Sequence, residues 1–129
     1  MRWPSTSVRA RQQQVALEAA EKLAEKGSDL SVLDLRWLCP IDEDGLRSAV
    51  RAASGRVIVL HEANRTGGFG AEVLARVYES LGDEMDVQVT QVATPDMRIP
   101  AVPILQRALL PTADKVVDAV ERLLTAMPS

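Results

Sequence analysis

The segment from Arg56 to Val73 constrains the fold more than any other part of the chain. It begins with four consecutive apolar residues, Val57–Leu60, three of which are valine or isoleucine. An apolar run without polar alternation is typical of a strand that is buried on both faces, as in a parallel sheet covered by helices. Polar residues and three glycines follow, and then apolar residues at helical spacing up to Leu81. The segment therefore predicts a strand, a glycine loop and a helix.

The rest of the chain shows the alternation expected of an α/β protein. Apolar residues at helical spacing predict helices that begin near Gln12, after Asp42 and after Pro111, and Asp42 is suited to be an N-cap. Shorter runs predict strands at residues 30–35 and 86–92, and the alternation of the second one is typical of an edge strand. This order of elements favours a three-layer α/β/α fold.

Composition excludes several classes of protein. A chain of 129 residues with 47% hydrophobic residues fits one ordinary globular domain. A net charge of −3 argues against nucleic acid as the main partner. No apolar run approaches the roughly 18 residues that span a bilayer, and the N-terminus is too polar for a signal peptide. The single cysteine, Cys39, fits a reducing compartment, so we expect a cytoplasmic protein with an inert thiol at this position.

His61 and Glu62 are the first candidates for catalysis. A histidine beside a carboxylate at the end of a strand is able to act as an acid or a base. Adjacent residues on a strand point to opposite faces, however, so the two do not easily share one reacting atom. His61 is also the only histidine, which argues against a histidine metal site. We favour a positional, hydrogen-bonded role for His61 and expect no catalytic, cofactor-binding or metal-binding residue.

The glycine loop has two interpretations. Gly67, Gly68 and Gly70 directly before a helix resemble a phosphate cradle, but the spacing is neither Gly-x-Gly-x-x-Gly nor a P-loop. The other interpretation is a tight turn, in which glycines allow a positive φ and close packing of strand against helix. We expect these three glycines to be turn-forming. Binding of a nucleotide or acyl-CoA by this turn, as in a stand-alone small-molecule sensor, is the alternative function.

Two segments carry apolar side chains among turn-forming residues. Phe69 is flanked by glycines, and a proline-rich segment that ends at Pro103 interleaves its prolines with the apolar residues Met97, Ile99, Val102 and Ile104. Either these side chains form a protein interface on the outer surface, or they fold back onto their own core. With the neighbouring polar residues, the candidates for partner binding are Glu62, Arg65, Thr66, Phe69, Glu72, Met97, Ile99 and Val102.

In their order along the chain, these segments resemble the C-terminal domain of the transketolase superfamily. The likeness is closest to the β subunit of the E1 component of 2-oxo acid dehydrogenase complexes, of the branched-chain, acetoin or pyruvate type. Its most specific part is His61-Glu62-Ala63 together with Thr66-Gly67-Gly68-Phe69-Gly70-Ala71-Glu72. The other parts are Val15-Ala16-Leu17-Glu18-Ala19-Ala20-Glu21-Lys22-Leu23, Val32-Leu33-Asp34-Leu35-Arg36, Pro40-Ile41-Asp42, Thr94-Pro95-Asp96 and Ile99-Pro100.

The resemblance implies a mostly parallel, mixed sheet of five strands and an assembly role without chemistry of its own. In the family, thiamine diphosphate, magnesium and the catalytic histidines belong to the α subunit and to the preceding domain of the β subunit. The resemblance implies E1 α, E1 β and the peripheral subunit-binding domain of E2 as partners. We therefore expect an oligomer that is inactive as an isolated chain and takes part in oxidative decarboxylation only with its partner domains. The residues do not identify the 2-oxo acid.

The N-terminus departs from the family pattern. The family has further strands before the first helix, whereas the region from Ser5 to Gln12 is too charged here for a buried central strand. We expect an irregular or atypical segment over residues 1–11 and the domain itself over residues 12–129. Either this end pairs unusually, or the helix extends back towards Ser5 and leaves the sheet short, with exposed edges that favour self-association.

Overall fold

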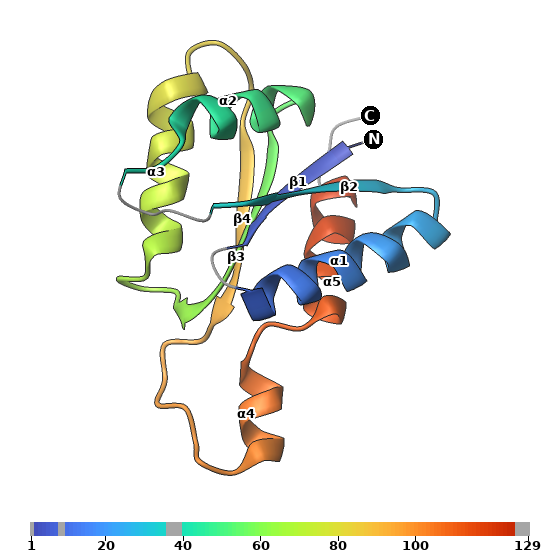
Figure 1. Ribbon diagram of the computed structural model, residues 1–129, viewed down its shortest axis with the longest axis vertical. Helices are drawn as coiled ribbons and strands as arrows, with labels where there is room; N and C mark the ends of the chain where they lie inside the picture. Colours follow the sequence, from blue (N-terminus) through green and yellow to red (C-terminus); the bar gives the residue numbers. More distant parts are fainter. Residues whose placement is uncertain (1, 8–9, 36–39, 126–129) are drawn as a thin grey trace.

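The computed structural model of the chain describes residues 2–7, 10–35 and 40–125 (Figure 1). Strands and helices alternate along most of this part of the chain, as the sequence predicts. In order, the elements are β1 (Arg2–Ser7), α1 (Ala10–Glu25), β2 (Asp29–Asp34), α2 (Glu43–Ala52), β3 (Arg56–Asn64), α3 (Phe69–Leu81), β4 (Gln88–Thr94), α4 (Pro103–Leu109) and α5 (Ala113–Thr125).

The four strands form one sheet in the order β2-β1-β3-β4, and all three pairings are parallel. β1 pairs with β2 from Arg2 opposite Asp29 to Ser7 opposite Asp34. The resemblance implies a mixed sheet of five strands, whereas the described residues form four strands and none of these is antiparallel. β4 lies at one edge of this sheet, as its alternating sequence predicts.

The N-terminal segment differs from the expectation of an irregular start. β1 is a central strand, with β2 on one side and β3 on the other. The strand ends at Ser7, so the charges of Arg9 and Arg11, on which the expectation rested, follow it in the sequence. The ladder between β1 and β3 begins only at Ser5, directly after Pro4, whose nitrogen carries no hydrogen to donate. A strand of this composition is therefore compatible with a central position.

Helices cover both faces of the sheet, with α2 and α3 on one face and α1 and α5 on the other (Figure 1). β3 contributes to both layers. Val57 and Val59 pack in a cluster with α2 and α3, while Ile58 and Leu60 pack in a cluster with α1 and α5. All four side chains have no exposed surface. The prediction of a strand buried on both faces, and of a three-layer α/β/α fold, is confirmed.

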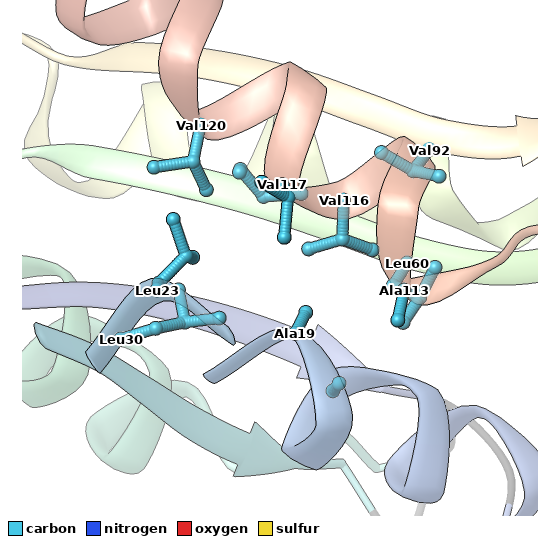
Figure 2. Close-up of a cluster of buried hydrophobic side chains, with 11 residues drawn as sticks. Ala19, Leu23, Leu30, Leu60, Val92, Ala113, Val116, Val117 and Val120 are labelled. Carbon is cyan, nitrogen blue, oxygen red and sulfur yellow. The ribbon is translucent and has the colours of Figure 1, made fainter. Parts of the chain in front are cut away.

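The cluster on the α1 and α5 side is almost entirely aliphatic (Figure 2). Figure 2 shows Val116, Val117 and Val120 of α5 lying towards the sheet, with Leu23 of α1 on the other side of the cluster. Small and branched side chains fill this layer, in agreement with a chain that contains only 3% aromatic residues. The predicted inner face of the last helix is thus confirmed at these three valines, which are at most 6% exposed.

The helix ends follow the local sequence signals. Asp42 is the N-cap of α2, and its carboxylate accepts a hydrogen bond from the backbone N–H of Gly45 at 2.9 Å. Gly27, which follows α1, has a φ of 82°, the left-handed conformation expected of a glycine C-cap. None of the described helices combines the length and the apolar composition that crossing a membrane requires. Cys39 lies outside the described residues, so the interpretation of its thiol stays a prediction.

α4 differs from the other helices because none of its residues is buried. The chain leaves β4, passes through the proline-rich segment and returns to α5 through α4, which lies beyond the end of the sheet (Figure 1). Lys115 of α5 links this excursion to the domain, since its ammonium group donates to the carbonyl oxygens of Ala108 at 2.7 Å and Leu110 at 2.8 Å. The fold thus places an exposed segment next to the carboxyl ends of β3 and β4.

Candidate functional site

The candidate site is the glycine turn, residues 65–70, between β3 and α3. It lies at the carboxyl edge of a parallel sheet, where ligands and partners of α/β proteins are commonly bound. Gly67 has a φ of 73°, which glycine adopts without the steric cost that other residues incur. The backbone N–H of Arg65 donates to the carbonyl oxygen of Thr94 at 3.0 Å, which holds the start of the turn against the end of β4.

His61 forms the floor of this turn. Its side chain is only 3% exposed, and its Nε2 lies 3.3 Å from Oε1 of Gln91 on β4. A Cβ built on Gly68 would lie 2.8 Å from Cε1 of the imidazole, and one built on Gly70 would collide with Nε2. The two glycines therefore allow the turn to pack directly on the ring. This arrangement supports a positional role for His61 and a packing role for the glycines.

Glu62 points away from His61. Its carboxylate accepts a hydrogen bond of 2.6 Å from Nε2 of Gln12, a residue of α1 that is only 2% exposed. The ring of His61, in contrast, meets the start of α3 on the other side of the sheet. The two side chains do not converge on a common point, as the alternation of side chains along a strand requires. The pair is therefore not arranged as a joint acid and base.

The turn is also connected to the proline-rich segment. The backbone N–H of Thr66 donates to the carboxylate of Asp96 at 2.9 Å, and the hydroxyl of Thr66 donates to the other carboxylate oxygen. These hydrogen bonds hold the pKa of Asp96 below its ordinary value of 3.8, and the nearby charge of Arg65 acts in the same direction. Asp96 thus fixes the segment that carries Met97 and Ile99 beside the glycine turn.

The other predicted partner-binding residues separate into two groups. Phe69 is half-buried and packs against the cluster of α2 and α3, so it partly folds back onto the core. Met97, Ile99 and Val102 are exposed, with Met97 at 50%. The remaining polar candidates, Arg65, Thr66 and Glu72, are exposed on the turn and the first part of α3, and Glu72 accepts a hydrogen bond from Arg76.

Ile104, which the sequence already offered as an exposed or folded-back residue, and Leu105, which it did not, extend this exposed apolar surface. Ile104 is 72% exposed and Leu105 is 51% exposed. Both lie in α4, directly after Pro103, and a short helix with adjacent apolar residues was the available signal. Together the exposed apolar residues form what we call the 97–105 surface: Met97, Ile99, Val102, Ile104 and Leu105.

The described residues do not fit the metal that thiamine diphosphate requires. They contain no group of three or more histidine, cysteine, aspartate or glutamate side chains placed to hold a metal ion. Four polar side chains near the turn are instead paired with one another, Thr66 with Asp96 and Gln12 with Glu62. These pairs link β3 to α1 and the glycine turn to the proline-rich segment.

Residues 10–116 match the family described as "Transketolase, C-terminal domain". The chain therefore belongs to this family of transketolase C-terminal domains, and the resemblance seen in the sequence is confirmed. A solved structure described as "Split gene transketolase, inactive beta4 tetramer" superposes with a TM-score of 0.77 at 30% identity and covers 95% of this chain and 39% of that chain. The three-layer fold is thus shared with a known transketolase structure.

Curated relatives are β subunits of 2-oxo acid or acetoin enzymes. The acetoin:2,6-dichlorophenolindophenol oxidoreductase subunit beta of Bacillus subtilis (strain 168) is 34% identical over 114 residues, which are 88% of this chain and 33% of that protein. The pyruvate dehydrogenase E1 component subunit beta of Leifsonia xyli subsp. xyli (strain CTCB07) is 39% identical over 85% of this chain and 32% of that protein. The 3-methyl-2-oxobutanoate dehydrogenase subunit beta of Mycobacterium tuberculosis (strain ATCC 25618 / H37Rv) is 35% identical over 84% of this chain and 31% of that protein. The chain spans about a third of the length of these relatives.

Proposed function

We propose that this chain is a non-catalytic assembly domain that acts as the C-terminal part of an E1 β subunit of a thiamine-diphosphate-dependent 2-oxo acid dehydrogenase. Under this proposal, thiamine diphosphate and magnesium are bound by other parts of the enzyme. The chain contributes to oxidative decarboxylation by holding subunits together. We further propose that the domain includes β1, and not only residues 12–129, because β1 lies in the centre of its sheet.

The observation that carries the proposal is the 97–105 surface. Five apolar side chains of this segment are exposed. α4, which carries two of them, contributes no buried residue to the core. Full burial of one exposed side chain of this kind contributes roughly 1.5–3 kcal/mol of favourable free energy. Contact with another polypeptide would therefore stabilise this surface. Contiguous exposed apolar residues are typical of protein interfaces. The fixed position of the segment beside the glycine turn supports a preformed contact site.

The proposed partners are further E1 β copies, an E1 α subunit and the peripheral subunit-binding domain of E2. The names of the relatives, each a β subunit, support a role within a larger assembly. The similar transketolase structure is described as a tetramer, which supports contacts between copies. Glu62, Arg65, Thr66, Phe69 and Glu72 are the proposed contact residues of the glycine turn and its flanks, next to the 97–105 surface.

Sedimentation of the purified chain tests the contact surface. We expect the chain to associate with rising concentration, and Ile104→Lys to shift it towards the monomer by placing a charge in the apolar contact. Leu17→Lys is the matched control, because Leu17 is 48% exposed on α1, away from the 97–105 surface. A chain that stays monomeric at all concentrations, or equal effects of the two variants, would contradict self-association through this surface.

An activity assay tests the non-catalytic assignment. The chain is incubated with thiamine diphosphate, magnesium and a series of linear and branched 2-oxo acids, and decarboxylation is measured. We expect no turnover above the uncatalysed rate. Measurable turnover in the absence of any other subunit would refute the proposal.

A further inference from the structure

A hollow between β4 and α5 has a volume of about 720 Å³, which falls in the range of small-molecule sites. Its lining includes none of the five residues of the 97–105 surface. The residues that line it come from the start of the glycine turn, from β4 and the residue after it, and from one face of α5. They are Arg65, Thr90, Gln91, Val92, Ala93, Thr94, Pro95, Lys115, Ala119, Arg122 and Leu123.

Every charged side chain that lines this hollow is positive. Arg65, Lys115 and Arg122 line it, and none of the described lining residues is acidic. Lys115 and Arg122 are seven residues apart, so they lie two turns apart on the same face of α5, about 10 Å along the helix axis. The chain as a whole has a net charge of −3, so this concentration of cations differs from the rest of the molecule.

Two of the three positive side chains, those of Arg65 and Arg122, have N–H groups that are available to a ligand. Within the described part of the chain, neither the guanidinium of Arg65 nor that of Arg122 forms a salt bridge. Both residues are exposed, so they are open to a ligand from solvent. Lys115 is different, since its ammonium group already donates to two backbone carbonyls and has one N–H left. Arginine binds carboxylate and phosphate groups through two parallel hydrogen bonds, which makes the two arginines the anchoring groups.

The uncharged residues that line the hollow restrict the chemical class of the ligand further. Val92, Ala119 and Leu123 provide an apolar wall, and Thr90 adds a hydroxyl group. None of the described lining residues is aromatic, so the hollow lacks the stacking surface that a nucleobase would use. A small aliphatic molecule with an anionic group at each end fits this combination of two separated arginines and an aliphatic wall.

We propose that the hollow between β4 and α5 binds a small aliphatic dianion, with its anionic groups on Arg65 and Arg122 and its chain against Val92, Ala119 and Leu123. The anionic groups are phosphates or carboxylates. This binding site includes none of the five residues of the 97–105 surface, but it shares Arg65 with the proposed contact residues of the glycine turn.

Titration calorimetry of the full chain at low salt tests the site, with propane-1,3-diyl bisphosphate and succinate as probes and acetate as the singly charged comparison. We expect at least one of the two probes to bind with a Kd below about 1 mM and acetate to bind much more weakly. Arg65→Gln and Arg122→Gln should each weaken binding about tenfold or more, because each removes a charge-assisted pair of hydrogen bonds. The probe that binds with the lower Kd shows whether the site prefers phosphate or carboxylate groups.

Arg98→Gln is the matched control, since it removes the same charge from an exposed arginine that does not line the hollow. Thermal unfolding of all three variants establishes that they remain folded. Binding that is unaffected by both hollow variants, or is weakened equally by Arg98→Gln, would overturn the proposal. The absence of binding by both probes would overturn it as well.

Discussion

Gly70 lies so close to the imidazole of His61 that the methyl group of an alanine at this position would collide with Nε2. Overpacking of this kind costs about 1–3 kcal/mol, so we expect Gly70→Ala to lower the free energy of unfolding by that amount. Urea denaturation provides the measurement. In a His61→Ala background the clash is absent, and the same substitution should cost much less. An equal cost in both backgrounds would show that the ring is not the obstacle.

The hydrogen bonds from Thr66 lower the pKa of Asp96, and this shift has a defined pH dependence. A carboxyl group whose pKa is lower in the folded state stabilises that state above its unfolded pKa. This contribution is lost as the pH falls through the folded pKa, which lies below 3.8. We therefore expect the contact between the glycine turn and the proline-rich segment to weaken only in strong acid.

The carboxyl resonance of Asp96, followed by NMR during acid titration, measures this pKa directly. Thr66→Val removes the hydroxyl donor, which makes the largest contribution to the shift, and should move the pKa back towards its ordinary value. Ser48→Val is a control, because Ser48 is exposed on α2 and forms no contact with Asp96. An unchanged Asp96 pKa in Thr66→Val would contradict the assigned cause.

Among the elements, α4 depends on Lys115 more than on packing. It has no buried residue, and the two hydrogen bonds from the ammonium group of Lys115 reach its C-terminal end. We expect Lys115→Met to increase hydrogen exchange at the helical amides of Gln106 and Leu110 about tenfold or more, while the melting temperature changes little. Lys22→Met is the matched control, since Lys22 pairs with Asp114 instead. Unchanged exchange in Lys115→Met would mean that α4 is held by other contacts.

The molecule as a whole should unfold in one step, because β3 contributes to the hydrophobic clusters on both faces of the sheet. Leu23 is 1% exposed, and Leu23→Ala should lower the free energy of unfolding by about 2–5 kcal/mol. Calorimetry should show a single transition in which the calorimetric and van't Hoff enthalpies agree. Leu17→Ala, on the exposed side of the same helix, should have an effect within about 0.5 kcal/mol. Two separate transitions would contradict a shared core.

Local patterns in the sequence were sufficient to predict much of the fold and part of the candidate site. The apolar run from Val57 to Leu60 predicted a strand buried on both faces, and the helical spacing after Gly70 predicted α3. Asp42 was identified as an N-cap, and the opposite orientation of His61 and Glu62 followed from strand geometry. These features depend on residues that are close in the sequence, so the spacing of apolar and polar side chains is enough to specify them.

Tertiary structure decided the features that depend on distant residues. β1 became a central strand because β2 and β3 both offer it backbone hydrogen bonds, which its polar sequence does not reveal. The exposure of Ile104 depends on where the chain returns to the domain after β4. The hollow is lined by both Arg65 and Arg122, which no sequence motif connects. Apart from β1, the sequence alone determined which segments form strands and helices and which family the chain resembles, because both depend on the order of residues that are close along the chain. Pairing, exposure and charge clustering were decided by the packing of segments that are far apart along the chain.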